Sequence, residues 1–119
     1  MLSKKIDAIK DVEFVECGGN FVLCKCINND VFAWGSNEHG QFGTGDRNRK
    51  NSPVKCSNWP KSVLDNLVDI KCGTYFTFVL TSNQEVYSCG DNEYCQLGRK
   101  AEGYLYDNLD NEFYYQVTY

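Results

Sequence analysis

The stretch VFAWGSNEHGQFGTG at residues 31–45 returns as VYSCGDNEYCQLG at residues 86–98, and this recurrence decides the fold. Without any gap, residues 12–45 align with residues 67–100, and ten positions are identical. Every matched pair is separated by the same 55 positions. A constant period of this length indicates a repeat protein, in which each copy forms one supersecondary unit.

Within this stretch and before it, each copy contains short runs of β-branched and aromatic residues, which are typical of strands. In the first copy we expect strands over Val12–Cys17, Phe21–Ile27 and Val31–Trp34. In the second copy the corresponding strands are Leu67–Cys72, Phe76–Thr81 and Val86–Cys89. Residues that tolerate unusual backbone angles separate the runs, such as Gly18-Gly19 and Asn28-Asn29-Asp30.

A fourth strand per copy is expected over Pro53–Cys56 and over Phe113–Thr118, and Ser62–Leu67 could form one helical turn. Pro53 favours an edge strand or the start of a strand, because proline has no N–H to donate. Four short antiparallel strands per repeat are typical of a propeller blade. The sequence therefore predicts an all-β fold of two four-stranded blades in an incomplete ring. The whole chain is one partial propeller region, with repeat one over about 9–56 and repeat two over about 63–119.

Over about residues 9–100, the strings CGGNF, VFAWGSNEHGQFGTG, CGTYFTFVLT and VYSCGDNEYCQLG resemble the repeat of the regulator of chromosome condensation family. The pattern of that repeat is roughly CGxxHTxALTxxGxVYxWGxNxxGQLGxG. The resemblance implies a β-propeller of about seven blades, of which this chain carries two. Phe21 and Phe76 stand where the family has His, and Cys89 stands where it has Trp.

The repeat motif itself predicts scaffold chemistry. Asn37 can bond its own backbone, Gln41 can satisfy buried backbone groups, and Gly43 permits close packing between blades. The residues assigned this structural role are Cys17, Gly18, Gly35, Asn37, Gln41, Gly43, Cys72, Gly73, Gly90, Asn92, Gln96 and Gly98.

The candidate binding residues lie in the loops: His39, its second-copy counterpart Tyr94, and the basic residues Arg47, Arg49 and Lys50. Catalysis by His39 would need a nucleophile and an orienting carboxylate, so an exposed loop histidine is the favoured interpretation. The basic loop could contact an acidic partner or a phosphate, or it could be a solvated connection between blades.

Composition excludes several classes of function. The formal charge of −4 disfavours nucleic acid, because binding to phosphates needs a broad basic surface. The seven cysteines include no C-x-x-C pair, so we interpret them as reduced thiols and expect no metal and no cofactor. No apolar run reaches the ~18 residues of a membrane span. We expect a soluble protein in the cytoplasm, with the nucleus as an alternative.

These observations favour a protein–protein interaction module without intrinsic catalysis. The resemblance alone implies the first alternative, guanine-nucleotide exchange on, or regulation of, a small GTPase similar to Ran. The second alternative is an architectural piece that completes another propeller, by self-association or by pairing with other blades. Two blades cannot close a ring, so we also expect the chain to be a fragment or a short member of the family.

Overall fold

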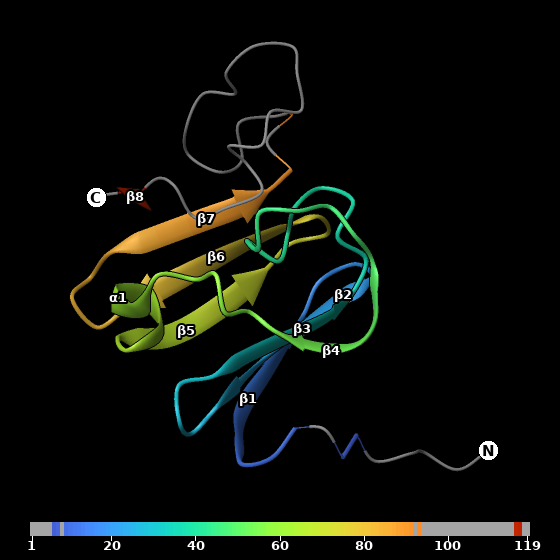
Figure 1. Cartoon of the computed structure of the whole chain (residues 1–119). Coiled ribbons are helices and arrows are strands. Elements are labelled where there is room, and N and C mark those ends of the chain that lie inside the picture. The colour runs from blue at the N-terminus through green and yellow to red at the C-terminus, as the bar shows by residue number, and fades with distance from the viewer. Residues whose placement is uncertain (1–5, 8, 92, 94–115, 118–119) are drawn as a thin grey trace.

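The computed structural model describes residues 6–7, 9–91 and 93, together with the backbone of residues 116–117. It contains two antiparallel sheets whose strands follow chain order (Figure 1). The first sheet consists of β1 (Val12–Cys17), β2 (Phe21–Cys26), β3 (Val31–Gly35) and β4 (Lys50–Lys55). A short helix α1 (Lys61–Leu64) precedes the second sheet, which consists of β5 (Leu67–Cys72), β6 (Phe76–Thr81), β7 (Val86–Gly90) and the two-residue β8 (Gln116–Val117). The predicted all-β fold of two unclosed blades is confirmed.

The strand predictions are confirmed with small changes at the ends. β1, β5 and β6 have the predicted bounds, and β3 and β7 each extend one residue into a glycine. β2 ends before Ile27, because the N–H of Cys26 donates to the carbonyl of Asp30 at 2.8 Å and closes the turn. α1 ends at Leu64, and Leu67 begins β5 rather than ending the helix.

The fourth strand of the first sheet differs most from its prediction. β4 begins at Lys50 instead of Pro53, since Lys50 pairs with Gly35 across the sheet. Pro53 therefore lies inside an edge strand, where the missing N–H is tolerated. Cys56 lies beyond the strand but still donates its N–H to the carbonyl of Val31 at 2.8 Å. Of the strand expected near the C-terminus, only β8 lies within the described residues.

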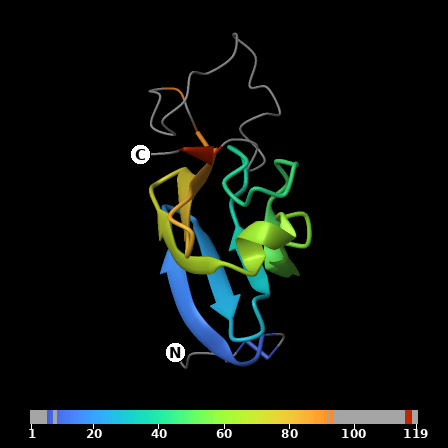
Figure 2. The ribbon, with the colours of Figure 1, turned by 90° about the vertical axis from the view of Figure 1, so that its left-hand side faces the viewer.

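The main core lies between the two sheets. It combines residues of both sheets with residues of the connection between β3 and β5: Phe21, Leu23, Val31, Ala33, Phe42, Cys56, Trp59, Val63, Leu67, Ile70, Val79 and Cys89. In Figure 2 this connection, in teal to green, runs along one side of both sheets. The first strands of the two repeats, β1 and β5, lie beside each other. The two sheets therefore pack as neighbouring blades.

The connection holds the two sheets together by packing and by hydrogen bonds. Phe42 and Trp59 are buried between the sheets, and the indole Nε1–H of Trp59 donates to the carbonyl of Phe42 at 2.7 Å. Thr77 on β6 donates its hydroxyl to the carbonyl of Gln41 at 2.7 Å. The buried indole N–H of Trp59 and the buried hydroxyl of Thr77 therefore each have a hydrogen-bond acceptor.

Equivalent positions of the two repeats differ in burial, because each sheet turns a different face toward the other. Ile70 is fully buried between the sheets, whereas its counterpart Val15 is 51 % exposed. In the opposite sense, Phe21 is 2 % exposed, whereas its counterpart Phe76 is half-buried. A smaller cluster of Ile9, Cys24 and Cys26 with Phe32 and Trp34 covers part of the outer face of the first sheet. Trp34 thus packs there and not in the main core.

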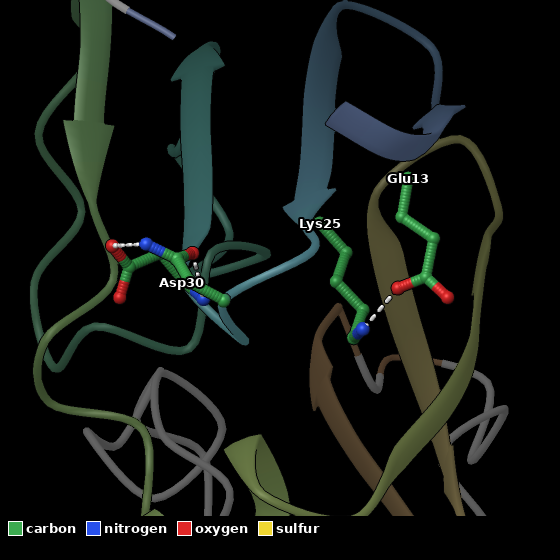
Figure 3. Close-up of polar contacts among 4 residues, drawn as sticks. Glu13, Lys25 and Asp30 are labelled. Carbon is green, nitrogen blue, oxygen red and sulfur yellow. Dashed lines mark hydrogen bonds and ion pairs between the residues drawn. The ribbon is translucent and has the colours of Figure 1, made fainter. Parts of the chain in front are cut away.

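A buried charge occurs in β2, where the strand pattern gives no sign of it. Lys25 follows Phe21 and Leu23 on the same face and is 5 % exposed. Its ammonium forms an ion pair with Glu13 on β1, as Figure 3 shows, and the side chain of Glu13 is half-exposed. The Lys25 ammonium needs such a partner, because a buried charge without a counter-charge strongly destabilises the folded state.

We expect Glu13→Gln to lower the free energy of unfolding by about 1–2 kcal/mol, since the Lys25 ammonium would keep its burial and lose its counter-charge. The control is Asp65→Asn, which breaks the exposed pair between Lys61 and Asp65 and should cost less than about 0.5 kcal/mol. Urea unfolding followed by circular dichroism measures both. Equal losses in the two variants would contradict the assignment of Lys25 as a buried, paired charge.

Candidate interaction surface

The loops at one end of both sheets form a continuous surface, which we call the rim. It comprises the turn at residues 18–20, the loop at residues 36–49 and the turn at residues 73–75. These segments share one end because β1 and β3 finish there, while β2 begins there. The N–H of Gly19 donates to the carbonyl of Thr74 at 3.1 Å, which joins the turn of one sheet to the turn of the other.

Two buried amide side chains fix the conformation of the loop at residues 36–49. Asn37 donates its Nδ2–H to the carbonyl of Asp46 at 2.9 Å, and its Oδ1 accepts the N–H of Phe42 at 3.0 Å. Gln41 accepts the N–H of His39 on its Oε1 at 2.9 Å. Gly43 has φ +66, so its role in the loop includes a left-handed turn. The motif residues therefore hold the loop in one shape and leave other side chains to face outward.

His39 contacts the second repeat through an aromatic ring. Its imidazole packs on Tyr75, with the ring centroids 4.6 Å apart and the planes tilted by 39°. Tyr75 is 42 % exposed, and His39 is half-buried. The geometry supports a role for His39 in shaping the rim.

The basic candidates follow His39 along the same loop. Arg47 and Lys50 are half-buried and Arg49 is exposed. Asp46 accepts the N–H of Asn48 at 2.9 Å, and this turn directs the chain into β4. The loop at residues 36–49 therefore carries three of the five binding candidates, and a fourth, Lys50, begins β4 directly after it. Tyr94 lies outside the described residues.

The other motif residues are placed as follows. Cys17-Gly18 and Cys72-Gly73 end β1 and β5 at the rim, and the N–H groups of Gly18 and Gly73 donate to Phe21 and Phe76. Asn92, Gln96 and Gly98 lie outside the described residues. Sequence reasoning missed Tyr75, because its counterpart in the first repeat is Asn20 and the comparison of repeats shows no shared aromatic residue there.

The cysteines of the described residues are free thiols. Burial raises the pKa of Cys56 to about 12, and burial followed by the charge of Cys26 raises the pKa of Cys24 to about 11. These two groups stay protonated at neutral pH and are poor nucleophiles. Cys17, in contrast, is exposed, and Cys95 lies outside the described residues.

Within residues 6–7, 9–91 and 93, no group of three or more His, Cys, Asp or Glu side chains could hold a metal ion. Over the same part of the chain, every helix is too short and too polar to cross a membrane.

Known protein families contain repeats similar to these two. The signature described as the regulator of chromosome condensation (RCC1) repeat matches residues 28–80, and a second signature with that description matches residues 12–41 and 67–96. The chain is 32 % identical over 108 residues to the mouse serine/threonine-protein kinase Nek9, covering 91 % of this chain and 10 % of the kinase. It is 33 % identical over 105 residues to the RCC2 homolog of Xenopus laevis, covering 84 % of this chain and 19 % of that protein.

A solved structure shares the fold. Prp20p from Saccharomyces cerevisiae, which was studied together with its binding to Gsp1p and histones, superimposes with a TM-score of 0.65 at 23 % identity. The match covers 73 % of this chain and 20 % of Prp20p. The chain thus spans between a tenth and a fifth of the length of these three proteins. From the two repeat signatures and the two stacked blades, we conclude that this chain belongs to the regulator of chromosome condensation (RCC1) repeat family.

Proposed function

We propose that the chain is a protein-interaction module that binds a partner protein through the rim and does not catalyse a reaction. The observation that carries this proposal is the contact between His39 and Tyr75, which joins the loop of one blade to the turn of the next. A surface that crosses two blades is held rigid by both of them. Loops on such a scaffold commonly carry binding residues.

The residues of the rim suit a protein partner. Tyr75 and Arg49 are exposed, and tyrosine and arginine are enriched among the residues that contribute most to protein interfaces. Arg47 and Lys50 add positive charge next to Arg49 along the chain. We therefore infer that the partner presents acidic side chains around an apolar or aromatic contact.

The test is affinity purification from cell extract, followed by binding measurements with the purified partner. The rim variant carries Tyr75→Ser and Arg49→Glu. The control carries Ile27→Ser and Lys10→Glu, which introduce the same two residue types and the same change in charge at exposed positions near the opposite end of the first sheet. We expect the rim variant to weaken binding at least about tenfold, while the control binds as the unmodified chain does. Equal binding by the two variants would overturn the assignment of the rim.

Small GTPases are the first partners to test, because Prp20p was studied for its binding to Gsp1p. Release of a fluorescent nucleotide from a panel of Ras-like GTPases measures exchange directly. We expect the chain not to accelerate nucleotide release, even from a GTPase that binds it. Accelerated release would overturn the proposal that the chain lacks catalytic activity and would favour nucleotide exchange.

A further inference from the structure

Each sheet has one face that its partner sheet does not cover. In the first sheet, Ile9 packs over Cys24 and Cys26 on this face and leaves Val15 and Val22 at least partly exposed. We call this face the leading face. In the second sheet, the uncovered face includes Phe76, Phe78 and Leu80, and we call it the trailing face. Val15 is 51 % exposed and Leu80 is 40 % exposed, which is high for apolar strand residues.

The packing inside the chain shows what these faces can bind. The residues equivalent to the leading face, Ile70 and Thr77, are fully buried where the second sheet docks on the first. Leu23, the residue equivalent to Phe78 of the trailing face, is fully buried on the other side of that contact. Within this molecule, therefore, the leading face of the second sheet already packs on the trailing face of the first sheet.

The trailing face is also hollowed. A hollow of about 470 Å³ is lined by Asp69, Lys71, Phe78, Val79, Leu80 and Val86. The equivalent surface of the first sheet, around Leu23 and Val31, is filled by the connection and the second sheet. A hollow lined mainly by apolar side chains, at the position where the other repeat is packed, is suited to receive another blade.

We infer that a second copy of this chain docks head-to-tail, with its leading face on the trailing face of the first copy. The contact would reproduce the packing between the two blades of one chain. It joins two different surfaces, so it is heterologous: each copy keeps one free face of each kind for a further copy. Both faces are separate from the rim, which lies at the ends of the strands.

Sedimentation velocity on the full chain tests this docking. The unmodified chain should show species heavier than its 13.6 kDa, and their share should grow with concentration. Val15→Glu blocks the leading face and Phe78→Glu blocks the trailing face. Lys71 is paired with Phe78 across the sheet, so the new carboxylate has a partner within the fold. Each variant alone should remain a monomer.

An equimolar mixture of the two variants gives the sharpest result. One variant supplies an intact trailing face and the other an intact leading face, so the mixture should form a species of twice the monomer mass. A mixture that stays monomeric, with both variants folded by circular dichroism, would overturn the head-to-tail arrangement. Ile27→Glu adds a charge at an exposed turn away from both faces and should associate like the unmodified chain. An unmodified chain that is monomeric at every concentration would also overturn the inference, and binding by the rim would be unaffected.

Discussion

Replacing Phe21 with alanine should lower the free energy of unfolding by about 3–5 kcal/mol, the usual cost of deleting a buried phenylalanine. Phe21 lies in the core between the sheets, with its ring centroid 6.3 Å from that of Phe42. Phe76→Ala is the matched control, because Phe76 is the same residue type at the equivalent position of the second repeat. Phe76 is half-buried and packs edge-on against Phe78, so we expect less than about half of that loss.

Urea unfolding followed by circular dichroism measures both variants at the same protein concentration. The difference between them isolates the contact between blades, since the chemical change and the position in the repeat are the same. If Phe76→Ala costs as much as Phe21→Ala, the trailing face is covered and the two repeats do not pack as described. The concentration should be low, because association through the trailing face would also bury Phe76.

The second large effect is expected at the glycine that ends β3. Gly35 has φ +101, and a Cβ built there would lie 2.4 Å from the carbonyl oxygen of Asn20. Gly35→Ala should therefore cost about 3 kcal/mol or more, from backbone strain and from displacement of a backbone atom that cannot move freely. Gly90 has φ +112 and the same close contact with the carbonyl oxygen of Tyr75, so Gly90→Ala should behave alike.

The matched control makes the opposite substitution, to glycine, at another residue with a positive φ. Asn29 also has a positive φ, of 73°, in the turn between β2 and β3. Asn29→Gly removes a side chain from a left-handed residue, so stability should change by less than about 1 kcal/mol. Thermal unfolding of the three variants makes the comparison. A Gly35→Ala variant as stable as the unmodified chain would show that β3 does not end in this conformation.

The sequence predicts the strands of this protein better than it predicts their surroundings. The period of 55 residues aligns β1–β3 with β5–β7, and local residue preferences then give their bounds within one residue. Burial is different, because it depends on which blade lies next to each face. Val15 and Ile70 are equivalent apolar residues on equivalent strands, yet only Ile70 is buried. The repeat pattern does not show which face of a blade packs against its neighbour.

The candidate surface was predictable in part for the same reason. The loop carrying His39 and Arg49 stands out because its residues 36–45 belong to the motif of the first repeat. Tyr75 could not be found this way, since its contact with His39 arises only when the two blades stack. Lys25 was hidden for a related reason. Its burial requires Glu13 on the neighbouring strand, and the bulge in β1 between Val12 and Phe14 shifts the register in which the two strands pair.

Trp59 reports directly on whether the two repeats stack into one cooperative unit. Trp59 is buried between the sheets. The substitution Trp34→Phe leaves it as the single tryptophan of the chain. In urea, the fluorescence of Trp59 and the strand signal in far-ultraviolet circular dichroism should change at the same midpoint. If Trp59 becomes exposed at a lower urea concentration than that at which the strands are lost, the blades separate before they unfold, and stacking into one cooperative unit is contradicted.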